Sequence, residues 1–170
     1  PATARARATA FCTRFGLRAP ILLAPMAGST PPALGAAVAN AGGLAGFGAL
    51  NSKPAAIAGW AAEFRAQSNG AFQVNLWVPD PPPVRDAACE QATAAFLAGF
   101  GPAPAIPGDG PLVEDFAAQC EAALAAAPAV MSSIMGLYPP AVVAAMKARG
   151  IAWFATATTL AEARAAVAAG

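Results

Sequence analysis

The sequence contains no histidine, and this absence excludes several kinds of chemistry from its 170 residues. They can assemble no Ser-His-Asp triad, no histidine-ligated metal and no imidazole acid or base. The three cysteines, Cys12, Cys89 and Cys120, are odd in number and far apart, which argues against a disulfide framework and against a zinc site. We therefore expect no metal centre, and we expect the reducing compartment of the cytoplasm.

Charged residues are also scarce. They make up 11% of the sequence, against about 25% in an ordinary globular chain. Hydrophobic residues make up 57% and the mean hydropathy is +0.51, a composition that excludes disorder and is typical of a buried parallel sheet. The net charge of +1 provides no long-range field, so we expect no nucleic-acid partner.

An uninterrupted membrane-spanning run is missing as well. Residues 19–52 carry no charge and are numerous enough to cross a bilayer, but prolines and a glycine pair divide them into short pieces. These interruptions are Pro20, Pro25, Pro31, Pro32, Gly42 and Gly43. We therefore expect no membrane helix and no membrane partner.

The arginine-rich start allows two interpretations. Arg5, Arg7 and Arg14 precede the first acidic residue, Glu63, and an acid-free basic start is typical of a transit peptide. Because this start runs directly into what we interpret as folded domain at Phe15, we favour an extended lead-in over residues 1–14.

Short apolar runs alternate with alanine-rich segments, which is the pattern of βα units on a parallel sheet. The predicted strands are Pro20–Pro25, Leu44–Leu50, Ala71–Val78, Ala129–Met135 and Ile151–Thr158. Between the first two predicted strands, Thr30 is the predicted N-cap of a helix that has Pro31 at its first position. The connection after the third strand is predicted to hold helices over 84–97 and 112–126 around a Gly/Pro-rich loop, 99–111, which we interpret as an insertion in one domain.

Five βα units in 170 residues allow two architectures. A closed (β/α)8 TIM barrel needs eight strands and typically about 250 residues, so the chain would be the N-terminal part of one. An open doubly wound sheet of five strands is the alternative. A barrel cut after five units would have unpaired strand edges, so we expect the isolated chain to be inactive and poorly soluble or oligomeric.

Several segments, taken in order, resemble one known family. They are TRFG at 13–16, PILLAPMAG at 20–28, TPPALGAAVANAGGLAGFGAL at 30–50, FQVNLWVP at 72–79, MSSIMGLYPP at 131–140 and ATATTLAEARAAVAAG at 155–170. As a set they are similar to the nitronate monooxygenase (2-nitropropane dioxygenase) family of FMN-dependent TIM barrels. The resemblance covers nearly the whole chain from Phe11 on, except for the loop 99–111.

The resemblance implies a flavin site at the carboxyl ends of the strands. Cofactor-binding residues would be Ala24, Pro25 and Met26 in the first-strand turn, Asn75 through its side chain, and Ser132 and Thr156 as polar residues facing the cofactor. For Asn75 the alternative is a tie to a loop, and for the two hydroxyls it is satisfaction by neighbouring backbone. Other residues have a site interpretation and a packing interpretation: Gly46, Gly48, Trp77, Met135 and Tyr138.

The activity that the resemblance implies is oxidation of alkyl nitronates by FMN and molecular oxygen in the full-length protein. The family's catalytic histidine and phosphate-binding loops would lie beyond Gly170, which agrees with the lack of histidine. The expected partners are a small nitronate or nitroalkane substrate and oxygen. A flavin-dependent enoyl-acyl carrier protein reductase with the same opening turn, or a non-catalytic flavin-binding module, is the alternative.

Overall fold

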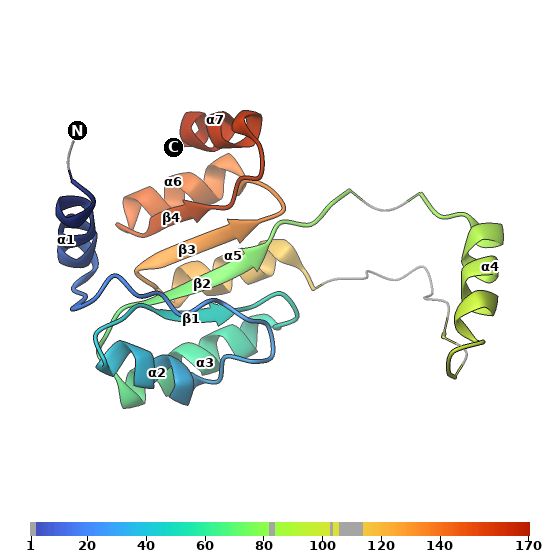
Figure 1. Ribbon diagram of the computed structural model, residues 1–170, viewed down its shortest axis with the longest axis horizontal. Helices are drawn as coiled ribbons and strands as arrows, with labels where there is room; N and C mark the ends of the chain where they lie inside the picture. The colour runs from blue at the N-terminus through green and yellow to red at the C-terminus, as the bar shows by residue number, and fades with distance from the viewer. Residues whose placement is uncertain (1–2, 82–83, 103, 106–113) are drawn as a thin grey trace. The chain divides into compact units, whose positions relative to one another are not determined.

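The computed structural model describes residues 3–81, 84–102, 104–105 and 114–170. The chain divides into two compact units, one made of Pro1–Pro79 with Glu114–Gly170 and the other of Asp80–Val113. The larger unit carries the sheet (Figure 1). The smaller unit contains the first helix predicted in the connection after the third strand, whereas the second predicted helix falls in the larger unit.

The sheet of the larger unit has four parallel strands. They are β1 (Ala45–Gly48), β2 (Phe72–Trp77), β3 (Val130–Ile134) and β4 (Ala152–Ala155). Their order is β1-β2-β3-β4, so each strand pairs with the next one along the chain. A doubly wound sheet reverses its strand order at a switch point, and these four strands show no reversal. The α/β class and four of the predicted strand positions are confirmed.

The first predicted strand, Pro20–Pro25, is wrong as a strand, because it forms only one isolated parallel bridge, between Leu22 and Leu44. The reason lies in two glycines of β1. A Cβ atom at Gly46 would overlap the carbonyl oxygen of Leu23, and one at Gly48 would lie 2.6 Å from the backbone nitrogen of Ala27. The chain beyond Leu22 therefore lies over a face of β1 that has no side chains, instead of continuing beside the strand.

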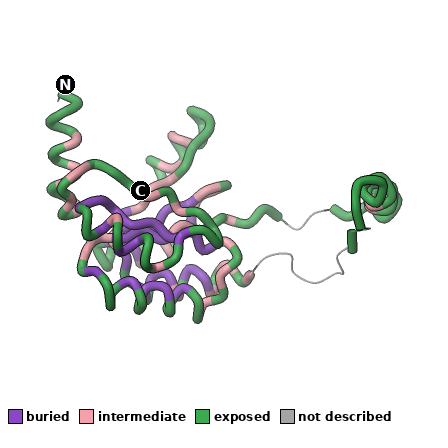
Figure 2. Tube along the Cα trace, turned by 60° about the horizontal axis from the view of Figure 1, so that its bottom comes forward, coloured by how far each residue is buried: buried purple, intermediate pink, exposed green. Residues whose placement is uncertain are grey.

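Helices cover the opposite face of the sheet. They are α2 (Pro32–Asn40), α3 (Pro54–Gln67), α5 (Phe116–Ala125) and α6 (Pro140–Ala148). Their apolar sides and alternate strand residues form the main core, in which Trp60 stacks between Phe47, at 4.8 Å between ring centroids, and Phe64, at 5.3 Å. Figure 2 shows buried residues concentrated in the sheet and in the helices that pack on it.

Proline at the first position starts α2, α3 and α6, because its missing N–H would have no partner there. The predicted start of α2 is wrong by one residue: Pro31 is the N-cap and Pro32 opens the helix. The hydroxyl of Thr30 donates instead to the carbonyl oxygen of Met26 at 3.0 Å, so it stabilises the turn before the helix.

The predicted extended lead-in is also wrong, because α1 (Ala4–Phe15) is a helix. Thr3 caps its first turn and Gly16, with φ of 67°, ends it. Alanine and arginine are strong helix formers, and phenylalanines four residues apart share one helix side. Those rings, Phe11 and Phe15, lie 6.2 Å and 5.7 Å from the ring of Phe154 in β4. Phe15, at the end of α1, packs against Leu44, Val130 and Ala152 at the amino end of the face that α2, α3, α5 and α6 leave uncovered. We call this face the helix-free face.

The remaining helices are α4 (Ala87–Leu97) and α7 (Leu160–Ala169). Asp86 caps α4 by accepting hydrogen bonds from the backbone nitrogens of Ala88 and Cys89. The helix therefore begins three residues later than the predicted 84–97 and ends at the predicted residue. Of the predicted loop 99–111 and helix 112–126, residues 103 and 106–113 lie outside the described part, and α5 begins at Phe116. No helix among the described residues is long and apolar enough to cross a membrane.

The contact at Gly48 predicts a specific loss of stability. In Gly48→Ala the new Cβ meets backbone atoms that cannot turn aside, so we expect the free energy of unfolding to fall by about 1–3 kcal/mol. Gly59→Ala is the control, because no atom lies within 4 Å of its Cβ position in α3; there alanine should add about 0.5–1 kcal/mol. Urea unfolding followed by circular dichroism measures both, and an unchanged midpoint in Gly48→Ala would contradict the close approach.

Candidate functional site

The helix-free face of the sheet brings the predicted polar residues together. Partner residues of parallel strands point to the same side, and the register pairs Gly48 with Asn75, Asn75 with Ser132, and Ser132 with Phe154. We call these four residues the Asn75 row. Their neighbours along the strands point to the other side, into the core beneath the helices. Asn75 and Ser132 therefore share one surface, as a common site requires.

The first-strand turn lies at the end of this row. A Cβ atom at Gly48 would lie 2.6 Å from the backbone nitrogen of Ala27 and 2.8 Å from the carbonyl carbon of Met26. The carbonyl oxygen of Met26 accepts from Ser29 N and from the Thr30 hydroxyl, both at 3.0 Å, and these bonds fix the turn. Gly46 and Gly48 thus serve close packing of backbone on backbone.

The backbone of the turn offers hydrogen-bond donors. Ala24 and Met26 are exposed, Met26 to 42%, and Pro25 is half-buried. Among the described residues, nothing accepts a hydrogen bond from the backbone nitrogen of Ala24 or Met26. These two N–H groups are therefore available to a ligand at the end of the Asn75 row.

Gln73, which was not predicted as a site residue, ties the same segment to the sheet. Its Nε2 donates to the carbonyl oxygen of Leu23 at 3.2 Å, and the residue is only 4% exposed. The signal for it was present, since Gln73 and Asn75 are two apart in FQVNLW and so lie on one face of a strand. A polar pair on an otherwise apolar strand indicates a polar surface on that side.

The side chain of Asn75 is bonded to the next strand and not to a loop. Its Nδ2 donates to the hydroxyl of Ser132 at 3.0 Å and to the Ser132 carbonyl oxygen at 3.3 Å. Its other polar atom, Oδ1, has no partner among the described residues, and no buried side-chain oxygen there lacks one, so Oδ1 is accessible. The amide thus presents one accessible acceptor on the helix-free face.

Thr156 and two apolar residues lie at the carboxyl ends of the strands. Thr156 is exposed directly after β4, two residues beyond Phe154, and its backbone nitrogen donates to Ser133 O at 3.0 Å. Trp77 and Met135 are 39% and 52% exposed. Met135 also has φ of 67°, a conformation that is strained for a residue with a side chain.

Tyr138 belongs to the core, as its packing interpretation predicted. It is 3% exposed, its ring is stacked at 6.2 Å from that of Phe116, and its hydroxyl donates to the Ser132 carbonyl oxygen at 2.8 Å. Burial raises the pKa of the Tyr138 hydroxyl far above its ordinary value, so it remains a proton donor in this bond at neutral pH.

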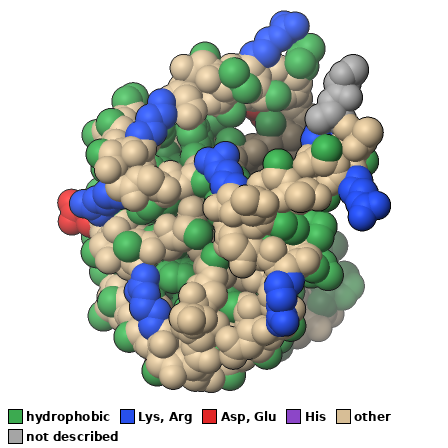
Figure 3. All heavy atoms as spheres, turned by 90° about the vertical axis from the view of Figure 1, so that its left-hand side faces the viewer, with side chains coloured by type: hydrophobic (Ala, Val, Ile, Leu, Met, Phe, Trp, Pro, Cys, Tyr) green, Lys and Arg blue, Asp and Glu red, His purple; other side chains and the backbone are tan. Residues whose placement is uncertain are grey.

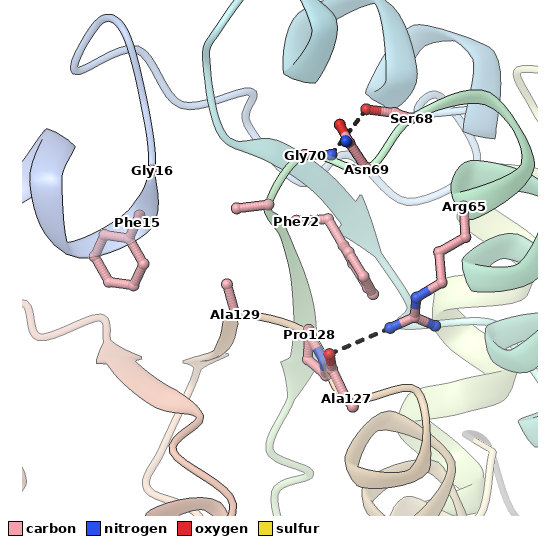
Figure 4. A pocket seen from close by; sticks show the side chains of 11 residues that line it. Phe15, Gly16, Arg65, Ser68, Asn69, Gly70, Phe72, Ala127, Pro128 and Ala129 are labelled. Atoms are coloured by element: carbon pink, nitrogen blue, oxygen red, sulfur yellow. Dashed lines mark hydrogen bonds between the residues drawn. The ribbon is translucent and has the colours of Figure 1, made fainter.

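A hollow of about 700 Å³ lies at the opposite, amino ends of β2 and β3 (Figure 4). The guanidinium of Arg65 crosses it, donating to the carbonyl oxygens of Ala126 at 2.5 Å and Ala127 at 3.3 Å, and lies 5.1 Å from the centre of the Phe72 ring. Arg65 thus provides hydrogen-bond donors for two carbonyl groups directly after the carboxyl end of α5. Figure 3 views the larger unit from this side, where Lys and Arg side chains are scattered and acidic ones are few. None of the predicted site residues lines this hollow.

The described residues contain no group of three His, Cys, Asp or Glu that could hold a metal ion. All three cysteines are free thiols, with Cys89 exposed and Cys120 buried. Burial, with a smaller contribution from Glu121, raises the pKa of the Cys120 thiol to about 12. Cys120 is therefore a protonated core residue at neutral pH.

Comparison with known proteins identifies the family of this chain. The family model for nitronate monooxygenase matches residues 9–170. The chain belongs to the nitronate monooxygenase family. It is 37% identical over 164 residues to a nitronate monooxygenase of Paraburkholderia phytofirmans, covering 92% of this chain and 44% of that protein. A second relative, a nitronate monooxygenase of Pseudomonas aeruginosa, is 34% identical over 99 residues, or 56% of this chain and 28% of that protein.

Solved structures of the same fold extend the comparison. Nitroalkane oxidase from Streptomyces ansochromogenes matches with a TM-score of 0.79 and 31% identity, over 95% of this chain and 46% of that one. FabK from Thermotoga maritima matches with a TM-score of 0.67 and 21% identity, over 99% of this chain and 42% of that one, which shows a shared fold. The chain spans less than half the length of these family relatives.

The two contrasting cysteines predict a thiol-reactivity pattern. At pH 8 we expect Ellman's reagent to modify exposed Cys89 rapidly and Cys120 only after denaturation, because the reactive thiolate is suppressed by burial. In a Cys12→Ser background, which removes the half-buried third thiol, Cys89→Ser should remove the rapid phase and leave the denaturation-dependent phase intact. Rapid modification of Cys120 in the native protein would contradict the packing of α5.

The raised pKa of Cys120 also predicts a pH dependence of stability. Its folded-state pKa of about 12 exceeds the ordinary 9.0, so the folded protein holds this proton more tightly. The corresponding stabilisation is complete below pH 9 and is lost as the pH rises toward 12. Urea unfolding between pH 8 and 11 should show a smaller loss in Cys120→Ala than in the wild type; equal losses would contradict the assignment.

Proposed function

We propose that this chain forms the first part of a (β/α)8-barrel flavoenzyme that oxidises alkyl nitronates with FMN and molecular oxygen. The observation that carries the proposal is the family match over residues 9–170. The likeness to nitroalkane oxidase, at 31% identity and a TM-score of 0.79, supports the same class of substrate. The proposed monooxygenase activity belongs to a full-length protein; the isolated chain is expected to be inactive.

The sheet supports the barrel as its architecture. In a (β/α)8 barrel each strand pairs with the next one along the chain, as these four strands do. The parallel bridge between Leu22 and Leu44 places the preceding segment next to β1, which continues the same strand order. The helix core covers one face, while the other carries Gln73, Asn75 and Ser132. In a barrel that second face is the interior, which ends in the active site at the carboxyl ends of the strands.

The residues present fit a flavin ring. Oxidised FMN has one ring N–H and several ring acceptors, and the accessible Oδ1 of Asn75 accepts hydrogen bonds only. The free N–H groups of Ala24 and Met26 supply donors for the acceptors, and the thioether of Met26 offers a polarisable surface. We assign the phosphate to none of the described residues, since barrels bind it with loops after the seventh and eighth strands.

The chain's own contribution to the reaction is orientation. When bound, FMN supplies the redox chemistry, accepting electrons from the nitronate and passing them to oxygen. Asn75 and the Met26 turn hold the ring, with Thr156 as a further polar contact. Trp77 and Met135 provide apolar surface beside an alkyl substituent. A nitronate is already deprotonated, so it needs no base from a chain that lacks histidine.

Asn75→Ala tests the flavin assignment. It removes one ring hydrogen bond, each worth about 0.5–1.5 kcal/mol, so we expect the dissociation constant for FMN to rise about 2- to 10-fold. Asn69→Ala is the matched control, because Asn69 is exposed and lines the hollow at the opposite ends of the strands. Quenching of flavin fluorescence in the full-length protein measures both.

Oxygen consumption with an alkyl nitronate then tests the reaction itself. A full-length wild type that stays colourless with FMN would overturn the proposal. A flavoprotein that does not oxidise nitronates but reduces an enoyl thioester with a nicotinamide would favour the alternative, an enoyl-acyl carrier protein reductase.

A further inference from the structure

We propose that Ser132 is a positioning residue that orients the Asn75 amide toward the flavin and does not contact the flavin itself. This inference rests on the proposed function, because it concerns the same cofactor site. It replaces the direct cofactor contact that the family resemblance implies for Ser132.

The contacts of Ser132 are directed at Asn75. Its hydroxyl and its carbonyl oxygen both accept from Asn75 Nδ2, at 3.0 Å and 3.3 Å. An asparagine amide can turn over and exchange its nitrogen and oxygen. In the reversed orientation Oδ1 would face the Ser132 carbonyl oxygen, and two acceptors repel each other. The carbonyl oxygen therefore determines which way round the amide lies, and the hydroxyl adds the shorter hydrogen bond that holds the amide in place. Oδ1 is left for a ligand donor.

Burial separates the roles of the two residues. Ser132 is 7% exposed, whereas Asn75 is half-buried and has the accessible oxygen. A ligand on the helix-free face would therefore reach the amide of Asn75 before it reached the hydroxyl of Ser132.

Ser132 is itself held from the helix side of the sheet. The Tyr138 hydroxyl donates to the Ser132 carbonyl oxygen at 2.8 Å, and Trp153 Nε1 donates to the hydroxyl of the next residue, Ser133, at 3.0 Å. The rings of Tyr138 and Trp153 contact each other at 5.9 Å. Tyr138 thus fixes the backbone at Ser132, whose carbonyl oxygen connects the core to Asn75, whereas Trp153 is bonded to the neighbouring Ser133.

Ser133 supplies a matched control for Ser132. Both are buried serines of β3 whose hydroxyls accept one side-chain hydrogen bond, but Ser132 bonds Asn75 and Ser133 bonds Trp153 on the opposite face. Ser132→Ala and Ser133→Ala should therefore lower the stability of the fold to a similar extent. Only Ser132→Ala should change the flavin site.

The test titrates the full-length protein with FMN and records the visible spectrum and the reduction potential of the bound flavin. In Ser132→Ala we expect about a fivefold rise in the dissociation constant, from loss of one hydrogen bond to the amide, with a shifted spectrum and potential. Ser133→Ala should stay within about twofold of the wild type, below the effect of a typical hydrogen bond. Ser132→Thr, which keeps the hydroxyl, should restore the wild-type values.

Each remaining outcome is informative. Equal dissociation constants, spectra and potentials in Ser132→Ala and Ser133→Ala would overturn the positioning role while leaving the proposed function intact. If Ser132→Ala does not fold, Ser132→Cys replaces it, because its sulfur is a weak acceptor of similar size and should change the site in the same direction. Failure of the wild type to bind FMN would overturn the proposed function and this inference together.

Discussion

The structure depends on one steric constraint, the absence of side chains on one face of β1. Because Gly46 and Gly48 leave this face bare, the backbone from Leu23 to Ala27 lies directly on it, and Gln73 holds the segment there. Gly48 pairs with Asn75 in the sheet, so the same contact brings the Met26 turn to the end of the Asn75 row. A larger residue at Gly48 would separate the turn from the amide.

The two faces of the sheet have different roles: the face under the helices stabilises the fold, and the other face carries the candidate site. Phe47, Trp60 and Phe64 stack beneath the helices and bury the apolar surface. The other face carries glycine and short polar side chains, which leave room for a ligand and give it partners. β3 joins the two, because Ser132 meets Asn75 on one side and receives the hydroxyl of Tyr138 from the other.

Much of the fold could be predicted from local pattern. β1 to β4 were predictable because apolar runs alternate with helical segments, three of which begin at proline. The path of residues 20–25 was not, since it depends on a tertiary contact with Gly46 that no local signal reports. α1 was missed because an arginine-rich start resembles a leader, although its phenylalanines share one helix side.

The site was predictable only in part. The resemblance indicated Asn75 and Ser132 separately, but their hydrogen bond joins residues 57 apart and depends on the β2–β3 register, which the sequence does not encode locally. Gln73 was visible as the polar partner of Asn75 at spacing two, yet its acceptor, Leu23 O, is a backbone atom of another segment.

The central claim is that the Met26 turn and the Asn75 amide face one flavin ring. A crystal structure of the full-length protein with FMN tests it most directly. The account predicts the ring N–H within hydrogen-bond distance, about 2.7–3.2 Å, of Asn75 Oδ1, with the ring against Met26 and no contact to the hydroxyl of Ser132. A flavin bound elsewhere, or one whose ring N–H bonds to Ser132 while Asn75 points away, would contradict it.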